Sequence, residues 1–251
     1  MNVIYKVNMV HETTATPRAI RREQASERIL DAAERILGAE GLEALTMQRL
    51  ASELNLTVGA AYRYFPSKEA IVAALQRRVL LALASDLAAE LEHEIADPLE
   101  RVARIARLYA SLAARRPLHA RLLSRMMGDP ANLVDAESGA ANTRVALEIG
   151  AIGVRELAAA REAGALDVGS DIERTLALFA ALTGVAQTRK LERWNVPGLS
   201  ADALADEVLR ALLVGWGADP ERAVGAIARA KEKTDAPRKK REARSSERKQ
   251  R

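Results

Sequence analysis

The chain has 251 residues, of which 49% are hydrophobic, 29% charged and 3% aromatic. Abundant Ala, Leu, Arg and Glu with little β-branched alternation favours helices over a sheet. The absence of cysteine excludes disulfides and zinc sites of the Cys type. The first residues contain too short an apolar run for a signal peptide, and no later run reaches the roughly 18 apolar residues of a membrane span, so we expect a soluble, cytoplasmic protein.

The formal net charge of +4 is unevenly distributed along the chain. Residues 231–251 contain ten Lys or Arg against four Asp or Glu, a local charge of +6, which leaves 28 against 30, or −2, for the rest. The positive total is therefore weak support for nucleic-acid binding by the folded body. We interpret residues 233–251 as a basic, disordered tail, either simply solvated or attracted non-specifically to phosphate.

Residues 1–24 predict a flexible N-terminal arm, which includes Arg18, Arg21 and Arg22. From Ser26 onward, apolar residues recur at the spacing of one helix face. Gly41 stands where a glycine that ends a helix is expected. The first helix is therefore predicted between Ser26 and Gly41.

Two short helices around a tight turn are predicted next. Thr46 is a good N-cap for a helix over MQRLASEL. Thr57 is a good N-cap for a helix over VGAAYRYF, which Pro66 ends because its ring disfavours helix in the preceding residue. Ser67 then caps a long fourth helix, which we expect to continue to Asp97.

The remaining sequence predicts a series of further helices. Asp-Pro pairs, a Ser-Asp-x-Glu capping box, prolines and glycines mark their ends, and Asp129-Pro130 is one more expected start. The predicted ranges are 98–115, 117–127, 138–163, 171–193, 201–215 and 220–232. The predicted fold class is therefore all-α.

The two short helices fit a helix-turn-helix, in which the first helix packs across the second and the second lies in the major groove of DNA. The apolar contacts between them are expected from Leu50, Ala51, Leu54, Leu56 and Ala61. Small side chains and one cation remain for the DNA side: Val58, Gly59, Ala60 and Arg63. Hydroxyl and ammonium donors suited to phosphate oxygens are Tyr62, Tyr64 and Lys68. The Thr57 end adds backbone N–H groups and the positive end of a helix dipole.

The segment TMQRLASELNLTVGAAYRYFPSKEAI resembles the DNA-binding region of the TetR family of regulators. The similarity comprises a capping Thr, a Leu-Ala pair, a Leu-x-Leu turn, a small residue before Tyr, the aromatic end YRYF and a Lys-Glu helix start. It covers about residues 26–75. The resemblance implies that Thr46, Tyr62, Tyr64 and Lys68 anchor phosphates, and that Val58, Gly59, Ala60 and Arg63 approach bases. For Tyr64, packing between helices is an equally good interpretation.

The resemblance also implies the domain organisation. It implies an arm (1–24), a three-helix DNA-binding domain (25–72), a larger helical-bundle domain for effector binding and dimerisation (73–232) and the basic tail (233–251). Helices 171–193 and 201–215 are expected to form a four-helix bundle in a homodimer. Their apolar stripes consist of Leu176, Phe179, Leu182, Leu204, Val208, Leu212 and Trp216. Such a protein would bind a palindromic operator in double-stranded DNA and, as a repressor, leave it when an effector binds.

A small-molecule effector of aliphatic or acyl type is favoured, because the larger domain is rich in aliphatic side chains and poor in aromatic ones. Candidate pocket residues are Tyr109, Met126, Met127 and Phe179. The histidines are too scattered for a metal site, and we find no catalytic constellation, so neither a metal, a cofactor nor an enzyme is expected. The alternatives are a constitutive architectural DNA-binding protein, and a helical-bundle lipid-binding protein or enzyme with a vestigial helix-turn-helix.

Overall fold

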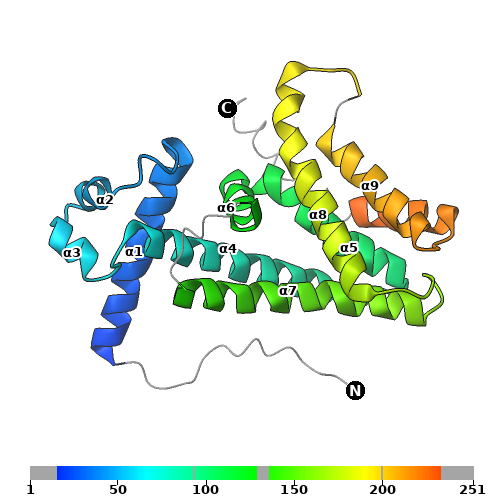
Figure 1. Ribbon diagram of the computed structural model, residues 1–251, viewed down its shortest axis with the longest axis horizontal. Helices are drawn as coiled ribbons and strands as arrows, with labels where there is room; N and C mark the ends of the chain where they lie inside the picture. Colours follow the sequence, from blue (N-terminus) through cyan, green and yellow to red (C-terminus); the bar gives the residue numbers. More distant parts are fainter. Residues whose placement is uncertain (1–15, 93, 129–135, 199, 233–251) are drawn as a thin grey trace, which may run out of the picture. The chain divides into compact units, whose positions relative to one another are not determined.

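The computed structural model of the chain describes residues 16–92, 94–128, 136–198 and 200–232, and over these ranges it contains helices and no strand (Figure 1). The prediction of an all-α fold is confirmed. The helices, in chain order, are α1 (Pro17–Ala39), α2 (Met47–Glu53), α3 (Val58–Tyr62), α4 (Lys68–Leu91), α5 (Pro98–Arg115), α6 (Pro117–Gly128), α7 (Ala136–Glu162), α8 (Asp171–Thr188), the 3-10 helix η1 (Arg189–Trp194), α9 (Ala201–Gly215) and a helix over residues 220–232. None of the described helices has the length and apolar character needed to cross a membrane.

The first helix begins earlier than expected, because α1 starts at Pro17. The Thr16 hydroxyl accepts the Ala19 N–H at 3.3 Å, and Pro17 at the first helical position already has the φ that a helix needs. The prediction of an arm that extends to residue 24 is therefore wrong for residues 17–24. Residues 1–15 of that arm lie outside the described residues, as does the tail at 233–251.

Two other helix limits differ from the prediction. The α4 helix ends at Leu91, several residues before Asp97, and the segment predicted as one helix over 171–193 changes to a 3-10 helix at Arg189. The predicted start at Asp129-Pro130 lies outside the described residues. The other helices after α4 begin and end within two residues of their predicted limits.

Backbone contacts divide the chain into two compact units, with the boundary between Ala74 and Leu75 inside α4. In the first unit, α1 packs against α2 and α2 packs against α3. The side chains of Ile29 and Ile36 in α1 and of Leu50 in α2 are almost completely buried. Burial of such aliphatic side chains contributes about 1.5–3 kcal/mol each and holds these short helices in place.

In the second unit, α5 contacts α6, α7, α8 and α9, so it is the central helix. Its Leu99 lies in one buried apolar cluster with Leu157 of α7, Leu182 of α8 and Leu213 of α9. Many other members of this cluster are alanines, which let the helix axes approach closely.

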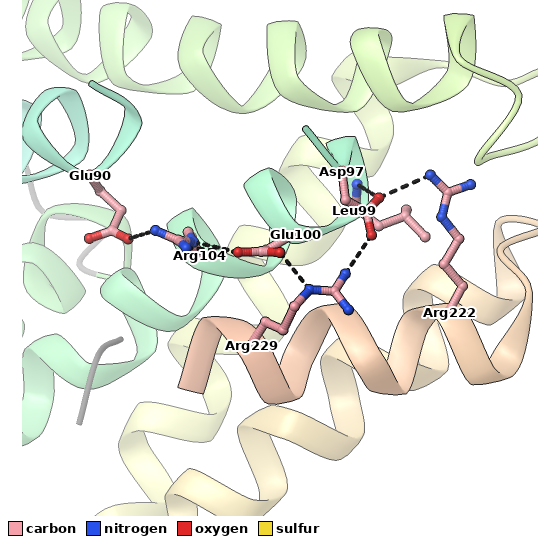
Figure 2. A network of polar contacts seen from close by, with 7 residues as sticks. All are labelled: Glu90, Asp97, Leu99, Glu100, Arg104, Arg222 and Arg229. Atoms are coloured by element: carbon pink, nitrogen blue, oxygen red, sulfur yellow. Dashed lines mark hydrogen bonds and ion pairs between the residues drawn. The ribbon is translucent and has the colours of Figure 1, made fainter. Parts of the chain in front are cut away.

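Four charged side chains join the start of α5 to the helix over residues 220–232, and we call Asp97, Glu100, Arg222 and Arg229 the clamp (Figure 2). Asp97 caps α5 by accepting the Leu99 N–H at 3.1 Å. Its two oxygens also bind Arg222 at 3.0 Å and Arg229 at 2.6 Å. Arg229 makes a second bond of 2.6 Å to Glu100. One guanidinium therefore bridges two carboxylates of the first turn of α5.

The clamp continues onto α4 through Arg104, as Figure 2 shows. Arg104 binds Glu100 at 2.7 Å and Glu90 of α4 at 3.3 Å. Burial raises the pKa of Glu100, but the hydrogen bonds from Arg229 and Arg104 outweigh it and leave this pKa below its ordinary value. Glu100 is therefore ionised at neutral pH, and the chain of ion pairs from the helix over 220–232 to α4 is complete.

Candidate nucleic-acid interface

The N-cap of α2 forms as predicted, since the Thr46 hydroxyl accepts the Arg49 N–H at 3.0 Å. The Arg49 guanidinium binds Glu53 at 2.8 Å and Glu40 at 2.9 Å. These bonds, that of Glu53 foremost, raise the pKa of Arg49. Arg49 is therefore engaged within the protein, where it ties α2 to the loop after α1.

The turn between α2 and α3 depends on Asn55, whose φ of 54° lies in the left-handed region. Asparagine tolerates this conformation better than most other residues with a side chain. The Leu56 N–H then returns to the Ala51 carbonyl at 2.9 Å. Leu50, Ala51 and Ala61 are buried as predicted, and Leu54 is half-buried.

The prediction that Leu56 packs between the helices is wrong, because its side chain is 39% exposed. The reversal of the backbone at Asn55 carries Leu56 out of the contact between α2 and α3, although its N–H remains bonded to α2.

The α3 helix begins at a second threonine cap, where the Thr57 hydroxyl accepts the Ala60 N–H at 3.2 Å. It ends at Tyr62, earlier than the predicted end before Pro66. The N–H groups of Tyr64 and Phe65 both bond to the Ala61 carbonyl, which makes a tight turn. This turn buries Phe65 and fixes the exit from α3.

One side of α3 is open to solvent, and we call Val58, Gly59, Tyr62 and Arg63 the recognition surface. Val58 is 38% and Tyr62 49% exposed, while Ala61 on the other side is 1% exposed. Gly59 and Arg63 are also exposed. A β-carbon at Gly59 would have no atom within 4 Å, so the protein itself leaves room there.

The other predicted DNA contacts lie beside this surface. Ala60 and Tyr64 are half-buried, as is Lys68, the first residue of α4. Thr46 and Thr57 are exposed at the starts of α2 and α3. All nine predicted contact residues therefore lie between Thr46, the N-cap of α2, and Lys68, the first residue of α4.

Two of the predicted effector residues meet between α5 and α8. The rings of Tyr109 and Phe179 have centroids 4.7 Å apart, and the Tyr109 hydroxyl lies 2.9 Å from the Thr183 hydroxyl. Thr183 donates its hydrogen to the Phe179 carbonyl at 2.8 Å, so Tyr109 is the donor of the pair. Burial raises the pKa of Tyr109, which keeps that proton in place. No sequence pattern pointed to Thr183, which lies 74 residues away from Tyr109.

The two methionines lie on α6, where Met126 is half-buried and the Met127 side chain lies outside the described part of the structure. Among the described residues, no group of three or more metal-ligating side chains occurs.

The apolar stripes of α8 and α9 separate into core and surface residues. Leu182 is buried, and Phe179, Val208, Leu212 and Trp216 are half-buried. On the surface of these helices, Ile172 is 62%, Leu176 61% and Leu204 37% exposed. This surface therefore leaves aliphatic side chains in contact with water.

Residues 29–75 match the family of bacterial regulatory proteins named tetR. The nucleoid occlusion factor SlmA of Vibrio vulnificus (strain YJ016) is 32% identical over 105 residues, 41% of this chain and 53% of that protein. The chain thus spans about half the length of this curated relative.

Among solved structures, a TetR/AcrR regulator from Thermobifida fusca superposes with a TM-score of 0.59 at 22% identity, over 77% of this chain and 98% of that one. The regulator FadR from Bacillus subtilis, solved in complex with stearoyl-CoA, has a TM-score of 0.61 at 19% identity, over 75% and 98%. These likenesses show a shared fold. The match at residues 29–75 identifies this segment as belonging to the tetR family of bacterial regulatory proteins.

Proposed function

We propose that the protein is a homodimeric transcriptional repressor that binds a palindromic operator in double-stranded DNA and leaves it when a small-molecule effector binds. The observation that carries this proposal is the recognition surface. One side of α3 is packed on the protein through Ala61, while the opposite side exposes small and polar groups. A helix with this division can enter a major groove and present its side chains to base edges.

Within this proposal, bases and phosphates are contacted by different residues. Val58, Gly59, Ala60 and Arg63 approach base edges, and the arginine can donate two hydrogen bonds to guanine. Tyr62, Tyr64 and Lys68 donate to phosphate oxygens. The capping threonines, Thr46 and Thr57, contribute to the same contacts: each uses an acceptor lone pair on the backbone, so its hydroxyl hydrogen remains for a phosphate.

Dimerisation is proposed through α8 and α9. One helix-turn-helix reads too few base pairs to select one site in a genome, so specificity requires two. The exposed Ile172, Leu176 and Leu204 supply the apolar surface that such an interface would bury. A regulator of this kind acts where the chromosome is, in the cytoplasm.

The effector is proposed to be an aliphatic or acyl molecule bound in the second unit, near Tyr109 and Phe179, with Met126 and Met127 as further contacts. The FadR neighbour, crystallised with stearoyl-CoA, supports this class of ligand. The Tyr109 hydroxyl is already bonded to Thr183, so the pair would offer a ligand its ring surfaces and no free polar group. Chain length should then control affinity, at about 0.8 kcal/mol for each buried CH₂.

The first experiment selects duplexes from a random pool with the purified full-length protein and footprints the selected sequence. We expect a palindrome with half-site centres separated by about one helical turn or somewhat more. The second experiment titrates fatty acids and acyl thioesters of increasing length against the complex and follows release by fluorescence anisotropy. Release that does not depend on chain length would contradict the effector class and leave the DNA-binding proposal intact.

A constitutive DNA-binding role is the second candidate, favoured by the similarity to a nucleoid occlusion factor. It predicts weak sequence preference in the selection and no ligand that releases DNA. A lipid carrier or enzyme with a vestigial helix-turn-helix predicts instead that the folded protein binds no duplex at all, together with lipid transfer or turnover.

A further inference from the structure

Three arginines at the start of α1 share one helix face, and we call Arg18, Arg21 and Arg22 the arginine face. Their spacing of three and four residues places them side by side. All three are exposed, and the first turn of α1 holds no acidic residue. Among the described residues, no ion pair involves any of the three.

The arginine face continues the side of α1 that packs inside the first unit. Ile29 follows Arg22 by seven residues and Ile36 follows by seven more, so these positions lie nearly in line along the helix. Both isoleucines are almost fully buried, whereas every residue from Pro17 to Gln24 is exposed. Figure 1 shows the start of α1 extending beyond α2 and α3. The same side of α1 therefore carries isoleucines where the helix packs in the core and arginines where the helix extends beyond the core.

The charge of the first unit is segregated in the same way. Residues 17–74 contain eight Lys or Arg and eight Asp or Glu, so their formal charge is zero. Three of these cations lie in residues 17–22 without any carboxylate, which leaves five cations against eight carboxylates, or −3, for residues 23–74. Residues 23–74, which include the recognition surface, thus have a negative formal charge.

The helix-turn-helix itself has few positive side chains that are available to bind DNA. Its cations are Arg49, Arg63 and Lys68, and Arg49 is bound to Glu40 and Glu53. Proteins obtain most of their sequence-independent affinity for DNA from Lys and Arg that neutralise phosphates. Arg63 and Lys68 are the two remaining cations in each subunit, and they supply little of this affinity because residues 23–74 have a negative formal charge.

Helix stability does not explain the arginine face, because cations near a helix N-terminus oppose the helix dipole. An anionic partner would relieve this repulsion. We propose that the arginine face binds the phosphate backbone of the DNA duplex, outside the base pairs that α3 reads. This inference rests on the proposed DNA-binding function and adds to it a second contact surface on each subunit.

The test compares the triple variant R18Q/R21Q/R22Q with a control of equal charge loss, R121Q/R144Q/K190Q, whose residues are exposed on the second unit. Each full-length protein is titrated by anisotropy against the selected duplex and against a random-sequence duplex, both of about 30 base pairs, long enough for two half-sites. The titration is repeated between about 50 and 200 mM salt. Circular dichroism and thermal melting check that each variant is folded.

We expect the arginine-face variant to lose affinity for random and selected duplexes alike, by at least about ten-fold near 0.15 M salt. The slope of log Kobs against log salt should become shallower by about 2–3 per subunit, since each phosphate contact contributes about 0.9. The control variant should keep the wild-type slope.

An unchanged slope in the arginine-face variant, with wild-type protein that binds DNA, would overturn this inference alone. Folded wild-type protein that binds no duplex would overturn the proposed function as well. Loss of binding to phosphatidylglycerol vesicles by the arginine-face variant, without loss of DNA binding, would assign the face to a membrane surface and refute its role on DNA.

Discussion

Replacing Gly59 by alanine should stabilise the protein and weaken its binding to the operator. Gly59 lies in the first turn of α3, and a β-carbon there would have no atom of the protein within 4 Å. Alanine is the better helix former by up to about 1 kcal/mol, and somewhat less near a helix end. We therefore expect Tm to rise by about 1–3 °C.

The same substitution should lower the affinity for DNA, because the recognition surface has no side chain at Gly59. The added methyl would occupy the space that a base edge fills in the complex. Loss of one well-fitted base contact typically costs about 1–3 kcal/mol, which is ten-fold to more than a hundred-fold in affinity. Binding to a random duplex, which depends on phosphate contacts, should change much less.

The matched control is Gly38→Ala in α1, an exposed helical glycine of the same unit with equal room for a methyl group. It should raise Tm in the same way without any change in DNA binding. Both variants are measured by thermal melting and by anisotropy on the selected duplex. If Gly59→Ala binds that duplex as tightly as wild type, Gly59 does not face the bases, and the orientation proposed for α3 is wrong.

Three further predictions concern single side chains. Lys68→Ala should weaken binding to all duplexes equally and reduce the salt slope by about 1 per subunit in anisotropy titrations; loss confined to the operator would contradict a phosphate role. Leu176→Glu should shift sedimentation from a dimer to the 27.2 kDa monomer with helicity retained, and an unshifted dimer would place the interface elsewhere. Burial raises the pKa of Glu156, but hydrogen bonds from Arg101 and Arg155 outweigh burial and lower this pKa below its ordinary value. The ionised Glu156 therefore stabilises the folded protein fully at neutral pH, and this stabilisation is lost as the pH falls below about 4. In urea titrations Glu156→Gln should therefore cost about 1–3 kcal/mol at pH 7 and much less at pH 3; an equal cost at both would refute the ionic account.

The sequence predictions are accurate where a feature depends on interactions between residues that are close together in the chain. The Asp97-Pro98 start of α5 and the Ser200 start of α9 are set by caps within three residues, and both helices have the predicted limits. The same kind of signal, Thr16-Pro17, marked the true start of α1, but the polar composition of residues 1–24 favoured an arm.

Features set by backbone reversal or by distant partners were missed. The exposure of Leu56 follows from the left-handed conformation of Asn55, which helical periodicity does not report. The contact between Tyr109 and Thr183 joins residues far apart in the chain. The candidate DNA interface is one continuous segment of sequence with its own caps and turn, whereas the arginine face depends on the extension of α1 beyond its core, which no local sequence pattern encodes.

The clamp has a consequence for the order in which the chain acquires its structure. Asp97 is bound by Arg222 and Arg229, which follow it by 125 and 132 residues. During synthesis the start of α5 thus lacks these counter-ions until nearly the whole described chain has left the ribosome. The contacts within the first unit close among its first 74 residues. We therefore expect the nascent protein to complete the unit proposed to read DNA long before the unit proposed to sense an effector, so that a stalled or truncated chain presents α3 without the dimer contacts that operator selection requires.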